Sequence, residues 1–134
     1  MSKGKSREGR RYRDAELAFR RYAGYGLDRR RRGLDMFEVC DAIRGLCSGQ
    51  SAYDMLAVYD TLRLLAAAGQ EECAEAVRAV YFAGGGRRPR RNDVTFRVRR
   101  HAYETSFDER TVYRQLRRAK EMYRLLRYGS SGRE

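Results

Sequence analysis

Arginines recur at helical spacing within residues 106–126, whose sequence is SFDERTVYRQLRRAKEMYRLL. Steps of four and then three residues separate Arg110, Arg114 and Arg117, which places them on one side of a helix. The planar guanidinium group can bond the O6 and N7 atoms of guanine together, and it also binds phosphate. Such a row predicts a DNA-contacting surface. We expect four residues to reach base edges, namely Arg110, Tyr113, Arg114 and Arg117.

The helix that would carry this row is predicted at residues 108–126. Two caps fit its first turn: Ser106 with Glu109 forms a capping-box pattern, whereas Asp108 would bond to the backbone three residues later. We favour Asp108 because this choice leaves Phe107 free to turn inward. The side opposite to the arginines carries an apolar stripe made of Val112, Leu116, Ala119, Tyr123 and Leu126.

A supporting helix should precede this one. Asn92 or Asp93 can cap it, and its inner side would consist of Val94, Val98 and Ala102. The stretch VTFRV also alternates with period two and could be a strand, but the spacing of four continues past it and no partner strand is visible. Residues 104–107 would then form a four-residue turn. This is the helix-turn-helix plan, in which the N-terminal half of the second helix enters the major groove.

Further cations near this motif could bind the phosphate backbone, which adds affinity without sequence preference. The predicted phosphate contacts are Arg87, Arg88, Arg90, Arg91, Arg97, Arg99, Arg100, Arg118 and Lys120. The plainer interpretation is a solvated arginine-rich helix in a bundle, preceded by an ordinary basic linker.

The distribution of charge along the 134 residues supports a local anion-binding surface. Lys and Arg number 30 against 18 Asp and Glu, which gives a net charge of +12. Residues 1–33 carry 12 basic and 4 acidic groups, residues 34–83 carry 3 and 8, and residues 84–134 carry 15 and 6. An acidic middle indicates a structural or protein-binding segment, which we expect to serve self-association or contact with RNA polymerase.

Composition and periodicity predict an all-α chain, with a helical hairpin or bundle in the N-terminal and middle part and a C-terminal helix-turn-helix. Helices are expected near Ala15–Tyr22, from Asp35 to Cys47, from a capping box at Ser51–Asp54 to Gly69, and from Glu71 to Gly84. The expected parts are a partly disordered basic arm (1–33) with a short helix, an acidic helical segment (34–83), a Gly/Arg linker (84–91), the helix-turn-helix (92–128) and a disordered tail (129–134).

The phrase DERTVYRQLRRA resembles the recognition helix of many bacterial helix-turn-helix proteins. The wider segment 92–126 is similar to the C-terminal domain of small phage transcription activators of the ArpU and RinA type, which are like the promoter-reading domain of sigma factors. The resemblance implies a phage or prophage transcriptional regulator that binds specific sequences of double-stranded DNA. It also implies that Thr111, Val112, Leu116 and Ala119 hold the helix while the arginines and Tyr113 face DNA.

Other classes of protein find little support. The three cysteines are an odd number without a C-x-x-C pair, so we predict neither a disulfide framework nor a metal site. The lone His101 has no nucleophile motif near it, and no phosphate-binding glycine loop appears, so we expect no enzyme and no cofactor. No apolar stretch would span a bilayer and no secretion signal opens the chain, which predicts a cytoplasmic protein without a membrane partner.

Two alternatives remain open within nucleic-acid binding. One is a DNA-packaging adaptor similar to the small subunit of a phage terminase, which would assemble as a homo-oligomer. The other is a nonspecific nucleic-acid-binding protein, in which Tyr12, Tyr22 and Tyr25 could stack on unpaired bases.

Overall fold

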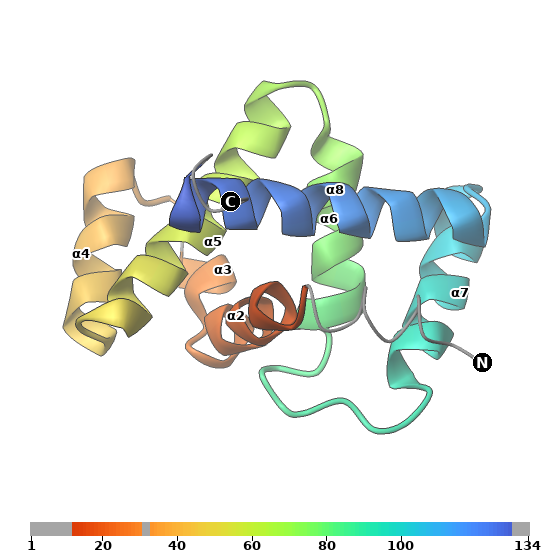
Figure 1. Ribbon diagram of the computed structural model, residues 1–134, viewed down its shortest axis with the longest axis horizontal. Helices are drawn as coiled ribbons and strands as arrows, with labels where there is room; N and C mark the ends of the chain where they lie inside the picture. Colours follow the sequence, from red (N-terminus) through yellow and green to blue (C-terminus); the bar gives the residue numbers. More distant parts are fainter. Residues whose placement is uncertain (1–11, 31–32, 130–134) are drawn as a thin grey trace.

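The computed structural model describes residues 12–30 and 33–129, and within them the chain is helical without a β-strand (Figure 1). The all-α prediction is confirmed, and the alternative strand at residues 94–98 is wrong because these residues lie in a helix. No helix among the described residues is both long and apolar enough to cross a membrane. The elements are α2 (Arg13–Gly24), α3 (Leu27–Arg30), α4 (Met36–Leu46), α5 (Gln50–Ala67), α6 (Glu71–Val77), the π-helical turn η1 (Arg78–Phe82), α7 (Asp93–Thr105) and α8 (Glu109–Tyr128).

Side-chain caps explain where two of these helices begin. Asp35 and Glu38 form a reciprocal capping box at the start of α4. Asp108 Oδ1 accepts a hydrogen bond of 2.7 Å from the Thr111 backbone N–H, as predicted, and this bond holds the pKa of Asp108 below its usual value. The expected box at Ser51–Asp54 is wrong, since α5 already begins at Gln50 after Gly49 and no side chain caps it.

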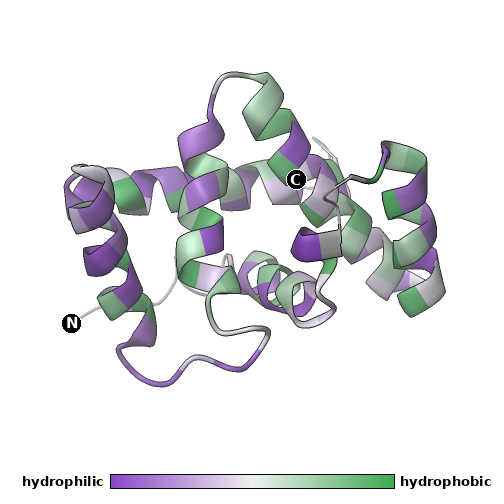
Figure 2. Cartoon of the chain, turned by 180° about the vertical axis from the view of Figure 1, so that it is seen from behind, coloured by the Kyte–Doolittle hydropathy of each residue, from purple (hydrophilic) through white to green (hydrophobic). Residues whose placement is uncertain are grey.

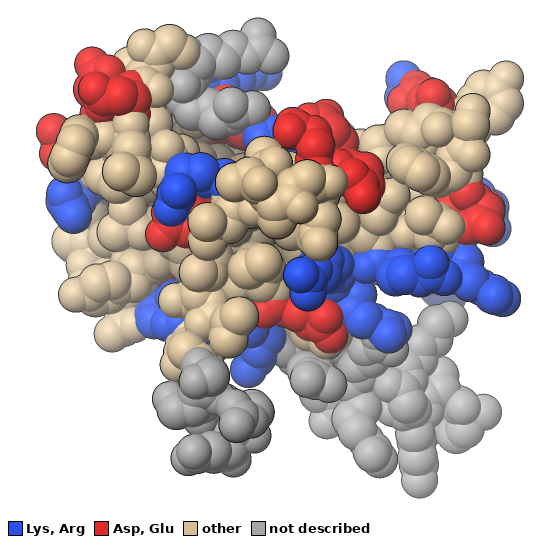
Figure 3. Space-filling view, turned by 90° about the horizontal axis from the view of Figure 1, so that it is seen from above, with Lys and Arg blue, Asp and Glu red and all other residues tan. Residues whose placement is uncertain are grey.

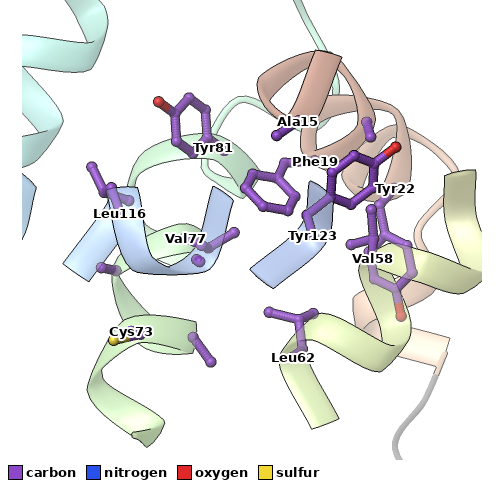
Figure 4. Close-up of a cluster of buried hydrophobic side chains, with 14 of the residues drawn as sticks. Ala15, Phe19, Tyr22, Val58, Leu62, Cys73, Val77, Tyr81, Leu116 and Tyr123 are labelled. Carbon is purple, nitrogen blue, oxygen red and sulfur yellow. The ribbon is translucent and has the colours of Figure 1, made fainter. Parts of the chain in front are cut away.

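The hydrophobic core is built around α8, which packs against α2, α5, α6 and α7. Four residues of its predicted inner stripe are buried, with Val112 and Ala119 fully inaccessible and Leu116 and Tyr123 each 1% exposed, whereas Leu126 is only partly buried against the core. Figure 4 shows Tyr123 beside Phe19, whose ring lies edge-on at a centroid distance of 5.9 Å. The helices that α8 joins come from both halves of the chain.

A single core extends from Ala15 to Tyr123, which differs from the expected division into parts. Helix α2 buries the predicted residues Ala15, Ala18, Phe19 and Tyr22 against the same helices that hold α8. The expected basic arm (1–33) continues after α2 as the short helix α3, in which Leu27 is only 1% exposed. Residues 84–91 form a loop between two elements of this one core. Residues 1–11 and 31–32 of the expected partly disordered arm, and residues 130–134 of the expected disordered tail, lie outside the described residues.

The turn between α7 and α8 is shorter than predicted. Helix α7 continues to Thr105, so Ser106, Phe107 and Asp108 make the whole connection. Ser106 has a φ of 65°, a left-handed conformation that ends α7 and rules this residue out as the cap of α8. Phe107 is 39% exposed and does not turn inward as expected. Helix α8 extends to Tyr128, two residues beyond its predicted end.

Close backbone contact fixes the loop 84–91 against the C-terminal end of α2. Gly86 has a φ of +92°, and a Cβ added there would lie 2.4 Å from the Cα of Gly24. Gly85 has a φ of +62° but nothing within 4 Å of an added Cβ. Both positions therefore favour glycine because of their positive φ, but only Gly86 also lacks space for a side chain.

We predict that Gly86→Ala destabilises the protein more than Gly85→Ala. The left-handed backbone alone should cost about 1 to 2 kcal/mol in the Gly85→Ala variant. Gly86→Ala should lose a further 1 to 3 kcal/mol or so, because the loop must move away from α2. Urea denaturation measures both free energies of unfolding, and equal losses would contradict the contact.

Candidate nucleic-acid interface

The predicted arginine row lies on the outer side of α8. Arg110, Arg114 and Arg117 are exposed, whereas Val112 and Leu116 on the opposite side of the same turns are buried. Seen from above, Figure 3 shows Lys and Arg side chains gathered in a band over the half of the molecule where α7 and α8 meet. The core therefore holds this helix with its cationic side toward solvent.

The two N-terminal arginines of the row are available for a ligand. Within the described part of the chain, neither Arg110 nor Arg114 forms an ion pair or a hydrogen bond. Both contribute to the low pKa of Asp108, after the larger effect of the Thr111 hydrogen bonds. They also lie in the first two turns of α8, where the unpaired backbone N–H groups add positive potential. This end of α8 combines fixed dipoles with mobile cations.

Tyr113 borders the row and is 44% exposed. Its neighbour on the other flank, Arg118, donates a hydrogen bond of 3.0 Å to Gln70 Oε1 at the turn before α6. Arg118 is nevertheless exposed. All four predicted base-contacting residues are exposed as well, namely Arg110, Tyr113, Arg114 and Arg117.

Lys120 contacts partly buried groups of the protein itself and is not positioned to contact a phosphate. Its Nζ lies 2.8 Å from Glu16 Oε2 and 5.3 Å from the centre of the Tyr81 ring, and its side chain is 14% exposed. The Tyr81 hydroxyl donates to the same carboxylate, and burial with this neighbouring charge raises the pKa of Tyr81 far above its usual value. These contacts join α2, η1 and α8. The structure thus removes Lys120 from the predicted phosphate contacts.

Arg97 is also used internally. Its Nη1 donates a hydrogen bond of 3.0 Å to the Val80 carbonyl oxygen, and its side chain is 20% exposed. Val80 lies in the last turn before the 84–91 loop, where helix carbonyls lack partners within the helix. Arg97 therefore holds α7 against η1, and it too is removed from the predicted phosphate contacts.

The remaining predicted cations form two groups at opposite ends of α7. Arg99 lies 3.7 Å from Glu109 at the start of α8, and Arg100 lies 3.2 Å from Glu104, with each guanidinium side chain 68% exposed. The loop group consists of Arg87, Arg88, Arg90 and Arg91, all exposed. Figure 1 places this loop at the far end of α7, and thirteen helical residues span about 20 Å. The loop is therefore separate from the α8 row.

Two exposed aromatic residues on α7 were not predicted to matter. Phe96 is 63% and Tyr103 is 88% exposed, while His101 on the inner side is 8% exposed. Phe96 and Tyr103 are seven residues apart with arginines between them, a spacing that places them on one side of the helix and could have indicated a surface role. That role was not predicted, because α7 was expected only to support α8. By contrast, Tyr12 and Tyr22 are buried, so they are not placed to stack on bases.

Cysteine chemistry is not part of this surface. Cys40, Cys47 and Cys73 are free thiols, and burial raises the pKa of the Cys73 thiol. Within residues 12–30 and 33–129, no three His, Cys, Asp or Glu side chains are grouped as metal ligands.

No protein family, curated protein or solved structure was found to match this chain. Its function is therefore argued from its own residues.

We predict that Lys120 and Arg114 differ in their contribution to stability. Lys120→Met removes a largely buried partner of Glu16 and should lower the free energy of unfolding by roughly 1 to 3 kcal/mol. Arg114→Met changes an exposed side chain and should stay within about 0.5 kcal/mol of the parent. Thermal or urea unfolding followed by circular dichroism compares them. A large loss in Arg114→Met would mean that this arginine is needed inside the fold.

Proposed function

We propose that the chain binds double-stranded DNA by laying the N-terminal half of α8 in the major groove. The observation that carries this proposal is the row Arg110, Arg114 and Arg117, which faces solvent from a helix whose opposite side is buried. A major groove about 12 Å wide admits an α-helix. The seven steps from Arg110 to Arg117 advance about 10 Å along the helix, so the row can follow the groove over about three base pairs.

The helices around α8 support this geometry. Helix α7 runs transverse to the N-terminal end of α8, and both pack against the helix formed by α6 and η1 (Figure 1). In the proposed helix-turn-helix, α7 lies across the backbone and α8 reads bases. Arg110, Tyr113 and Arg114 are nearest to base edges, while Arg118 at the flank is suited to a phosphate.

Acidic groups near the row are few and engaged. Glu109 lies 3.7 Å from Arg99, and Glu121, one turn beyond Arg117, accepts a hydrogen bond of 3.0 Å from the Tyr12 hydroxyl. Carboxylates that already have partners within the protein repel a phosphate less than free ones. The outer side of α8 therefore favours a polyanion over its first three turns.

We further propose that this binding serves transcriptional regulation, in a protein of the small phage-activator type. The support is the phrase DERTVYRQLRRA together with its placement, since Val112, Leu116 and Ala119 face inward as that resemblance implies. Sequence reading, rather than general affinity for nucleic acid, is the property that separates a regulator from a nonspecific nucleic-acid-binding protein.

The variant Arg110→Ala/Arg114→Ala should lose DNA affinity without losing stability. We expect at least about a tenfold weaker complex with duplex DNA, since each base contact contributes roughly 1 to 3 kcal/mol. The slope of log K against log salt should change little, because contacts to base edges neutralise no phosphates. Fluorescence anisotropy across a salt series gives both quantities.

The matched control is Arg21→Ala/Arg63→Ala, which removes the same charge from exposed positions on α2 and α5. It should weaken binding much less, because the long-range field is screened beyond about 10 Å in 0.1 M salt. Equal losses in the two double variants would show that total charge, and not the α8 row, determines binding.

Selection from random duplex DNA should recover a consensus sequence at physiological salt. Arg114→Ala should then relax the preference at one position of that consensus while the other positions keep theirs. A library without a consensus, or an Arg114→Ala variant that binds all sequences more weakly in the same proportion, would contradict sequence reading and favour a nonspecific protein.

A further inference from the structure

The loop between η1 and α7 carries a dense group of arginines at the end of α7 that lies away from the α8 row (Figure 1). We define the arginine loop as residues 84–91, whose cations are Arg87, Arg88, Arg90 and Arg91. All four side chains are exposed, and residues 84–92 contain no acidic residue. Figure 2 shows the loop as mainly hydrophilic. It is a second cationic surface of the molecule.

The guanidinium groups of the arginine loop have no partner inside the protein. Within the described part of the chain, none of the four side chains forms a hydrogen bond or an ion pair. The next acidic residue, Asp93, accepts a hydrogen bond of 2.7 Å from the Arg90 backbone N–H and lies 3.9 Å from Arg97. Arginines that hold the fold differ, since Arg78 and Arg127 lie 3.2 Å and 2.6 Å from aspartates. The loop cations are therefore available to a ligand.

Contacts with the rest of the protein hold the backbone of the arginine loop in place. Gly86 passes against Gly24 of α2, and a Cβ added to Gly84 would lie 3.2 Å from Arg97 Nη2. Backbone hydrogen bonds of 3.2 Å and 3.0 Å close a turn at each end of the loop. A loop that is already ordered loses less conformational entropy when it binds a partner.

The chemistry of the arginine loop indicates phosphate as its ligand. Four like charges within five positions raise the local electrostatic potential, and a bound anion lowers it. The planar fork of each guanidinium group matches the oxygens of a phosphate. The centre of a protein interface is usually apolar, whereas the loop has only glycines and Pro89 beside its arginines. A nucleic-acid backbone therefore fits this surface better than the acidic face of a protein.

We propose that the arginine loop binds the sugar–phosphate backbone of nucleic acid, without reading bases and independently of the α8 row. Residues 87–91 span at most about 14 Å. Duplex DNA carries a phosphate about every 1.7 Å along its axis, so each of the four arginines can find one. This inference extends the proposed DNA binding to a second surface and does not require α8 to read bases.

Single-stranded DNA separates the two surfaces, because it carries phosphates but has no major groove for α8. Arg88→Ala/Arg91→Ala should weaken binding of the full chain to a random single strand of about 20 nucleotides by at least about tenfold near 50 mM salt. The slope of log K against log salt should fall by about 1.4, since each phosphate contact on a single strand contributes about 0.7. Fluorescence anisotropy over a salt series measures both quantities.

Two control variants separate the loop from total charge and from folding. Arg44→Ala/Arg63→Ala removes the same charge from exposed positions on α4 and α5, and it should weaken single-strand binding by less than about threefold because the long-range field is screened. Arg88→Lys/Arg91→Lys keeps the charge and should keep a salt slope near that of the parent. Circular dichroism should show that all three variants are folded, since every changed side chain is exposed.

Three outcomes would overturn the proposal. They are a parent protein that does not bind the single strand at about 50 mM salt, an Arg88→Ala/Arg91→Ala variant that binds it as the parent does, and a control Arg44→Ala/Arg63→Ala that loses as much affinity. In the second case the loop would remain as a surface for an acidic protein.

Failure of the α8 proposal has a different signature. Arg110→Ala/Arg114→Ala should weaken binding to duplex DNA and leave binding to the single strand close to that of the parent. If this variant bound duplex DNA normally, groove binding by α8 would be contradicted, while the loss in Arg88→Ala/Arg91→Ala would still support the arginine loop.

Discussion

Burial of the inner stripe of α8 joins both halves of the chain into one hydrophobic core. Tyr123 reaches Phe19 of α2, and α8 packs against α5 and α6 with Leu116 and Ala119 buried. A twenty-residue helix this rich in arginine would be marginal in isolation, because its like charges repel one another and it has little to bury alone. Its stability comes from packing. The outer arginines are therefore carried on a rigid support, which lowers the entropy lost when they bind a partner.

The same packing divides the cations into those that hold the fold and those that face solvent. Lys120 and Arg97 bond to groups of α2 and η1, and Arg127 Nε donates to Asp54 on α5 at 2.6 Å. Arg110 and Arg114 have no such partner among the described residues, and both are exposed. The net charge of +12 consequently overstates what a polyanion can reach. What matters for binding is the part of that charge that α8, α7 and the 84–91 loop present to solvent.

Patterns among residues close together in the sequence were sufficient to predict much of the local structure. Caps at Asp35 and Asp108 involve residues three apart, and the apolar stripe of α8 repeats every three or four positions, so the sequence determines both directly. The Ser51–Asp54 box failed because Asp54 is drawn to Arg127, 73 residues away, while α5 starts earlier at Gly49. Likewise the Lys120–Glu16 pair joins residues 104 apart, and the Arg97–Val80 contact depends on where a helix ends. Spacing along the sequence does not predict contacts between residues that lie so far apart.

The division into parts could not be obtained from composition for a related reason. Glycines and arginines at 84–91 resemble a linker in sequence, yet Gly86 is required where that loop passes close to Gly24 of α2. A loop of this composition is compatible with two separate domains or with one core, and only the apolar contacts that lie far apart in sequence decide between them. Here the contact between Phe19 and Tyr123 shows that both halves share one core.

The size of the α8 row limits how tightly a single copy can hold DNA. Even if each of its three arginines neutralised one phosphate, the salt slope would be near −3, which is small beside proteins that make six to ten such contacts. Through α8 alone, a single copy would therefore hold DNA weakly at physiological salt, and helix-turn-helix proteins generally overcome this limit by binding as dimers. In a dimer the second binding event becomes intramolecular, and its effective concentration replaces contacts that α8 alone does not provide.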